Sequence, residues 1–177
     1  MHCNSYKIDC LKYIFIFCIS AIILILGISI ILSCCSKNGD KSILTAVAVE
    51  GDNTQLGTTF IKFSKNDIVV GNAITHEEGS DSIFIKETGI YQISYQLFGI
   101  KQGTGSFNFN AVLAVNDVPV ESTFNDGPVI EDFANNRITL TSTVILKLNS
   151  GDTLKLLGIS LEDIAYEKAR IDIEKIA

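Results

Sequence analysis

The stretch from Ser82 to Gly99 constrains the fold of this chain more than any other segment. It opens with a short apolar run, and Glu87-Thr88-Gly89 follows as a tight turn in which Gly89 is free to take a positive φ at no steric cost. Beyond the turn, every second residue is apolar and large, and the residues between are polar: Tyr91, Ile93, Tyr95 and Leu97 against Gln92, Ser94 and Gln96. This two-residue period predicts a long strand with one buried face, central in its sheet.

Shorter segments of the same kind recur from Ile43 to the C-terminus, separated by turns rich in Gly, Asn and Asp. We predict about nine strands and no full-length soluble helix in this part, which indicates an antiparallel sandwich, barrel or jelly roll. The further strands are expected at residues 44–49, 58–63, 83–85, 107–115, 118–120, 138–148, 153–157 and 169–173.

Three details of this β-rich part can be predicted from the residues alone. Asn116-Asp117 is expected to form a hairpin turn, and Pro119 after it indicates an edge strand or a strand start, because proline donates no ladder hydrogen bond. Residues 66–81 are expected to be loop-rich. Residues 161–168 are predicted to form either a helical turn or a polar loop with Tyr166 packed inside.

An uncharged apolar run from Ile14 to Ser33 precedes the β-rich part. Its length of roughly 20 residues suits a helix that crosses a bilayer and exceeds a typical signal-peptide core. The predicted organisation is a short tail (1–13), one transmembrane helix or lipoprotein signal (14–35), a linker (36–42) and a jelly-roll domain (43–177). Lysines flank the run on both sides, so the positive-inside rule barely discriminates. We favour the N-terminus inside and the C-terminal domain displayed outside.

All five cysteines lie at or before residue 35. The β-rich domain therefore has no disulfide framework, no thiolate metal site and no cysteine nucleophile. Ile31-Leu32-Ser33-Cys34 resembles the lipobox of bacterial lipoproteins. Three states of Cys34 and Cys35 stay open: processing and lipidation at Cys34, acylation of either cysteine without cleavage, and no modification.

The charged residues argue against two classes of function. The chain carries a net charge of −6, and an acidic protein repels a phosphate backbone, so we expect no nucleic-acid partner. The domain has a single histidine, His76, no GxSxG motif and no carboxylate pair at a spacing that favours glycoside hydrolysis. We expect no catalysis. Glu77, Glu78 and Asp81 form either a Ca²⁺ site or a solvated acidic loop, and we expect no other cofactor.

Several motifs, in the same order, resemble a known family. They are Gly71-Asn72-Ala73-Ile74 and the segments 83–91 (IFIKETGIY), 113–120 (LAVNDVPV) and 169–177 (ARIDIEKIA). Over residues 68–177 the chain resembles the C-terminal domain of the collagen-like exosporium glycoprotein of Bacillus (BclA), a TNF-like jelly roll of the complement globular-head type. The resemblance implies a TNF-like jelly-roll sandwich that forms a homotrimer through one face. The chain departs from the family in having no Gly-X-Y repeat and in having a hydrophobic anchor in place of the exosporium leader.

Four aromatic residues have two interpretations: Tyr91, Tyr95, Phe107 and Phe109. They form the core between two sheets, or some of them lie on the threefold axis of a trimer, since aromatic residues are enriched at the centres of interfaces.

The function that we expect is that of a non-enzymatic, membrane-anchored surface protein with a trimeric TNF-like head. It would have a structural or adhesive role on a bacterial cell or spore surface, with a surface-layer or receptor protein as partner. Two alternatives stay open: a surface module that binds a carbohydrate or another ligand through its loops, and a small lipoprotein with an enzyme partner.

Overall fold

The computed structural model describes residues 41–49, 58–101, 108–129, 137–161 and 164–177. The chain divides into Met1–Gly39 and Asp40–Ala177, and all described residues belong to the second unit. The predicted tail (1–13), the predicted transmembrane segment (14–35) and both lipidation candidates, Cys34 and Cys35, lie outside the described residues. The described residues include no helix long and apolar enough to cross a membrane.

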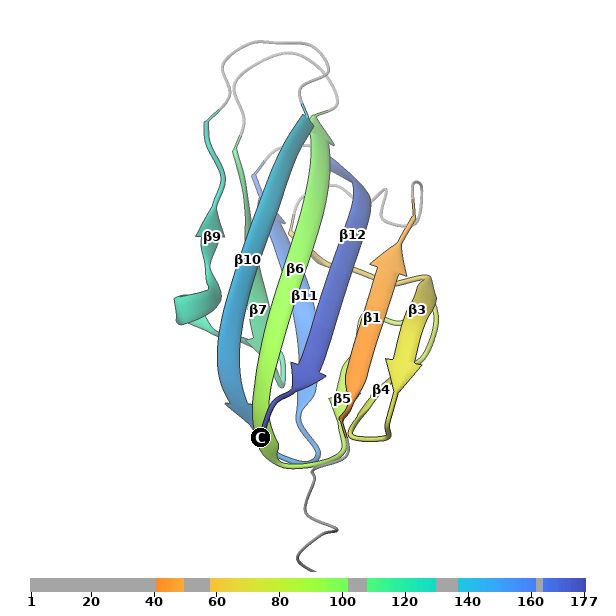
Figure 1. Ribbon diagram of the computed structural model, residues 1–177. Coiled ribbons are helices and arrows are strands. Elements are labelled where there is room, and N and C mark those ends of the chain that lie inside the picture. The colour runs from red at the N-terminus through yellow and green to blue at the C-terminus, as the bar shows by residue number, and fades with distance from the viewer. Residues whose placement is uncertain (1–40, 50–57, 102–107, 130–136, 162–163) are drawn as a thin grey trace, which may run out of the picture. The chain divides into compact units, whose positions relative to one another are not determined.

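The first of two antiparallel sheets has five long strands (Figure 1). Their order across the sheet is β10 (Arg137–Leu148), β6 (Gly89–Lys101), β12 (Ile164–Lys175), β1 (Ile43–Ala48) and β3 (Lys65–Val70). Each neighbouring pair is antiparallel.

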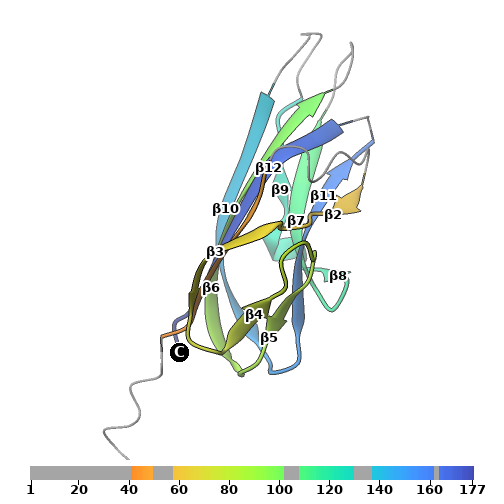
Figure 2. The ribbon, with the colours of Figure 1, turned by 90° about the vertical axis from the view of Figure 1, so that its right-hand side faces the viewer.

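The second sheet faces the first across the core, and the turned view separates the two (Figure 2). Its main path is β4 (Ile74–His76), β5 (Ile83–Ile85), β11 (Thr153–Ser160), β7 (Phe109–Val115) and β8 (Val118–Pro119). Strand β2 (Thr59–Phe60) pairs with β11, and β9 (Asn125–Asp126) pairs with β7. A single 3₁₀ turn, η1 (Glu121–Thr123), links β8 to β9.

Strand β6 occupies the position that its sequence predicts. It is hydrogen-bonded to β10 on one side and to β12 on the other, so it lies in the interior of its sheet. The inward side chains are 0–3% exposed: Tyr91, Ile93, Tyr95 and Leu97. The two-residue period therefore located both the strand and its buried face.

Gly89 does not use the freedom to take a positive φ. The glycines with a positive φ in the described chain are Gly71, Gly79 and Gly151. A Cβ on Gly89 would collide with the backbone carbonyl oxygen of Ala177. That same oxygen accepts a hydrogen bond from the Ile90 amide at 2.7 Å. Glycine is needed here because the C-terminus crosses close to the start of β6.

The predicted turns and edges beyond β6 agree with the structure. Asn116 and Asp117 have φ angles of 52° and 64°, as a two-residue type I′ hairpin requires. Pro119 lies in β8, which ends the main path of its sheet. Tyr166 is 1% exposed, as the loop alternative for residues 161–168 expected, but it lies in strand β12 (Ile164–Lys175) and not in a loop.

Four predictions about the number and the bounds of the secondary-structure elements are wrong. The described residues form twelve strands rather than nine. Residues 66–81, expected to be loop-rich, contain strand β4 and most of the edge strand β3, whose largely exposed side chains give it no alternating pattern. Neither a helical turn nor a loop occurs over residues 164–168, because β12 begins at Ile164. The strand expected over 58–63 shrinks to the two residues of β2.

Candidate functional site

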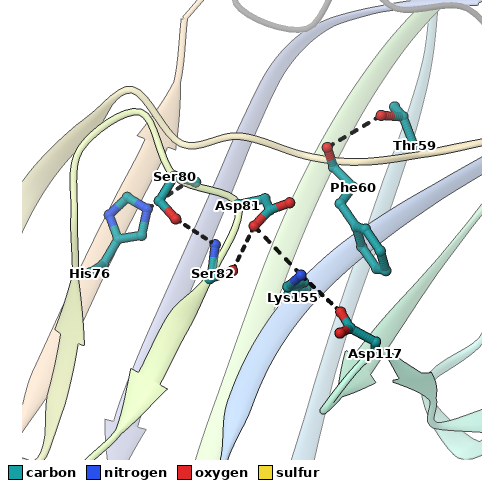
Figure 3. A network of polar contacts seen from close by, with 8 residues as sticks. All are labelled: Thr59, Phe60, His76, Ser80, Asp81, Ser82, Asp117 and Lys155. Atoms are coloured by element: carbon teal, nitrogen blue, oxygen red, sulfur yellow. Dashed lines mark hydrogen bonds and ion pairs between the residues drawn. The ribbon is translucent and has the colours of Figure 1, made fainter.

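A lysine on the outer face of the second sheet is held between two carboxylates (Figure 3). The Nζ atom of Lys155 lies 2.8 Å from Oδ1 of Asp117 and 3.7 Å from Oδ1 of Asp81. It also lies 4.7 Å from the centre of the Phe60 ring, within cation–π range. The hydrogen bond with Asp117, above all, raises the pKa of Lys155, so the amine stays charged. The cluster joins the turn after β7, the loop before β5 and strand β2 onto β11.

The same loop is fastened at its other end by His76. Its Nδ1 lies 2.7 Å from Oδ1 of Asn66, and its Nε2 lies 3.0 Å from the carbonyl oxygen of Ser80. The side-chain Nδ2 of Asn66 in turn donates to the carbonyl oxygen of His76 at 3.0 Å. The imidazole packs edge-on against Phe63, with ring centres 6.0 Å apart. Both ring nitrogens are thus occupied in holding the edge strand β3 and the loop before β5 against β4.

The calcium candidates lie in this loop, but two of the three carboxylates make other contacts. Glu78 accepts a hydrogen bond from the backbone amide of Asn66 at 3.0 Å, and Asp81 pairs with Lys155 and accepts from Ser82 Oγ at 2.6 Å. Glu77 is exposed. Within the described chain, no three His, Cys, Asp or Glu side chains converge as a metal ion requires. The structure does not bring Glu77, Glu78 and Asp81 together as a ligand set.

The structure places three of the four aromatic residues that the sequence assigned to the core or to a trimer interface. Tyr91, Tyr95 and Phe109 are at most 3% exposed within a single protomer. The hydroxyl of Tyr91 donates to the carbonyl oxygen of Glu87 at 2.6 Å. Such enclosed side chains belong to the core interpretation and have almost no surface left for a second copy. Phe107 lies outside the described residues.

The outer face of the five-stranded sheet has two chemically different halves. On β6 and β10 the outward side chains lie opposite one another across the two strands. The sequence alone did not single them out as functional residues. We call the following eight residues the uncharged face: Gln92, Ser94, Gln96 and Phe98 of β6, and Thr139, Thr141, Thr143 and Ile145 of β10. At its centre the hydroxyl groups of Ser94 and Thr143 share a hydrogen bond of 2.9 Å.

The other half of this face, on β12 and β1, is charged. Arg170 makes two hydrogen bonds to the carboxylate of Asp172, at 2.8 and 2.9 Å. Thr45 donates to the same carboxylate at 2.6 Å. Partial burial opposes ionisation of Asp172, but the hydrogen bonds from Arg170 and Thr45 outweigh it and hold the pKa of that carboxyl below its usual range. Glu174 pairs with Lys41 at 3.0 Å.

A comparison of the outward-facing positions in the predicted strands could have found the uncharged face from the sequence. On β6 these positions read Gln, Ser, Gln and Phe, without a charge in an acidic chain. The signal in a single strand is weak, because exposed strand positions are often Ser, Thr or Gln. It becomes distinct only when β10 is placed beside β6, and the sequence does not supply that pairing.

The comparisons with known proteins identify the fold. No model of a known protein family and no curated protein matches the sequence. The globular domain of zebrafish complement 1qA protein superposes with a TM-score of 0.54 at 11% identity, covering 77% of this chain and 98% of that chain. Murine APRIL at pH 5.0 superposes with a TM-score of 0.53 at 14% identity, covering 77% of this chain and 99% of that chain. Residues 41–177 therefore contain an antiparallel, two-sheet jelly roll of the kind found in the complement C1q globular domain and in APRIL, the TNF-like fold that the sequence motifs predicted.

Proposed function

We propose that this chain is a non-enzymatic, membrane-anchored surface protein whose jelly-roll head assembles as a homotrimer through the uncharged face. Its role is structural or adhesive, on a bacterial cell or spore surface. The apolar run at residues 14–33 supplies the anchor in this proposal.

The uncharged face is the observation that carries the proposal. The centres of protein interfaces are depleted in charged residues, because a charge buried without a partner costs several kcal/mol. Eight outward side chains on two adjacent strands carry no charge, and Lys147 stands at one end of the row, opposite Ile90. Ile145 is 62% exposed and Ile90 is 40% exposed, so the protomer leaves apolar surface here for a partner to cover.

The resemblance to the exosporium glycoprotein domain supports the same arrangement. That family forms trimers through one face of the jelly roll, and the C1q- and APRIL-like fold agrees with it. A fold hosts many functions, so the role at the surface rests on the anchor and on the uncharged face rather than on the fold.

The absence of catalysis in the proposal rests on how the titratable side chains are used. His76 has both ring nitrogens in contacts that hold the loop before β5. Asp81 and Asp117 are paired with Lys155. In each case the contacts of the side chain hold parts of the fold together, so its presence needs no catalytic role.

The solution mass of residues 41–177, measured by light scattering, tests the trimer. The buried core lies within this segment, between Leu44 and Ile173. A mass three times that of the monomer is expected, and a stable monomer would refute the proposal.

A charge placed in the uncharged face sharpens the test. Thr143→Asp puts a carboxylate at the centre of the uncharged face, so the trimer should dissociate while the protomer stays folded, as its circular dichroism would report. Thr75→Asp is the matched control, because Thr75 is exposed on β4 in the other sheet. If both variants stay trimeric, the interface lies elsewhere.

A further inference from the structure

An apolar groove lies on the outer face of the second sheet, on the opposite side of the sandwich from the uncharged face. Val112 of β7 and Ile159 of β11 form its floor, and Pro119, Glu121 and Phe124 form its wall. The groove is open to solvent and has a volume of about 430 Å³. Val112 at its base is 1% exposed, whereas Phe124 at the rim is 48% exposed. An exposed aromatic ring over an apolar floor is typical of an interaction site.

The wall of the groove is held rigidly. Oγ1 of Thr123 in η1 accepts a hydrogen bond from the Leu113 amide at 2.9 Å and donates to the carbonyl oxygen of Val120 at 2.7 Å. From the opposite sheet, the hydroxyl of Tyr95 donates to the carbonyl oxygen of Thr123 at 3.2 Å. The turn that carries Phe124 is therefore fixed to both sheets. A groove formed in advance loses little entropy when it is filled.

The described charges at the groove are negative. Among the described residues that line it, Glu121 is the charged one. Further along β11, on the same outer face, Lys155 stands between Asp81 and Asp117, so that cluster carries one net negative charge. Complementary charge steers and orients a partner, so a partner with positive charge beside its apolar group is favoured here.

We propose that this groove binds a segment of a partner protein in which a large aromatic side chain is flanked by lysine or arginine. The aromatic group fills the space over Val112 and Ile159 beside the ring of Phe124, and a flanking cation reaches the carboxylate of Glu121. The site does not depend on the proposed trimer, because it lies on the other sheet.

The test uses two peptide probes with the full-length chain, kept in solution with a non-ionic detergent. Acetyl-Lys-Phe-Lys-amide and its neutral counterpart acetyl-Gln-Phe-Gln-amide are titrated while the methyl NMR signals of Val112 and Ile159 are followed. The Lys peptide should shift both signals saturably and bind about threefold more tightly than the Gln peptide, the advantage of one exposed ion pair. Glu121→Gln should remove that preference. Phe124→Ala should weaken both peptides, and Phe84→Ala, which truncates a ring of similar exposure on β5, should weaken neither.

Several results would overturn the proposal. Methyl signals that do not move with millimolar peptide would exclude the site. Equal affinity for the two peptides would exclude a cationic partner, and an equal loss in Phe84→Ala and Phe124→Ala would show unspecific contact with exposed rings. If the Val112 and Ile159 signals move on dilution without peptide, a second copy of the chain fills the groove instead.

Discussion

The hydroxyl of Tyr95 connects the two sheets, and removing it gives a prediction with a magnitude that follows from the geometry. The side chain is 3% exposed, and its hydroxyl reaches from β6 across the core to the carbonyl oxygens of Thr123 at 3.2 Å and Ala111 at 3.4 Å. Tyr95→Phe keeps the ring and removes the donor. A buried hydrogen bond of this kind is worth about 1–2 kcal/mol in the free energy of unfolding.

Tyr95→Ala removes the ring as well and leaves a cavity between the sheets. Truncating a buried aromatic side chain typically costs about 3–5 kcal/mol, so the alanine variant should lose clearly more stability than the phenylalanine variant. For a domain of this size, 1 kcal/mol corresponds to roughly 4 °C in the thermal midpoint.

Thermal and urea unfolding of residues 41–177, followed by circular dichroism, measure both variants. Phe84→Ala is the control, because Phe84 is 41% exposed and the loss of its ring should cost much less than the loss of the Tyr95 ring. A Tyr95→Ala midpoint unchanged within error would show that the tyrosine is exposed and that the two faces of β6 are misassigned. A stable alanine variant would refute the fold reasoning, and an unchanged phenylalanine variant would refute only the hydrogen bond.

Three further predictions follow from individual contacts. Gly158→Ala should lower the free energy of unfolding by about 1–3 kcal/mol, because the new Cβ would lie 2.6–2.7 Å from three side-chain atoms of the buried Tyr166. A smaller loss in a Tyr166→Leu background, measured by urea unfolding, would confirm this cause. Asp152→Asn should lower the thermal midpoint at neutral pH but not in acid. The hydrogen bond from the Asn149 backbone amide, above all, lowers the pKa of the Asp152 carboxyl. The stabilisation by ionised Asp152 is therefore present above about pH 4 and is lost as the pH falls through the lowered folded-state pKa. An equal difference between the two proteins at both pH values would contradict this. Millimolar Ca²⁺ should leave the thermal midpoint of residues 41–177 unchanged, because two of the three carboxylates in the acidic loop before β5 already have partners; a rise that needs Ca²⁺ and not Mg²⁺ would contradict that assignment.

Local patterns predicted much of the sandwich because several of the strands that they located, β6 and β11 among them, bury one face only. Burial of alternate side chains imposes the two-residue period on β6, on β11 and on the C-terminal half of β12. The period is absent in β3, where both faces are largely exposed, and this edge strand was missed. The two-residue period also does not predict the close approach of Ala177 to Gly89, since that contact joins two distant parts of the chain.

The sequence by itself determined the class of fold, the position of the hairpin turn at Asn116-Asp117 and most of the core, because turn chemistry and side-chain burial act over a few neighbouring residues. Only the tertiary structure decided which surfaces result. The uncharged face exists because β10 lies beside β6, which brings Ser94 against Thr143, 49 residues away in the chain. The cluster around Lys155 gathers side chains from β2, from the turn after β7 and from the loop before β5. The register of strand pairing between distant segments places these groups together, and a local window of sequence contains no information about that register.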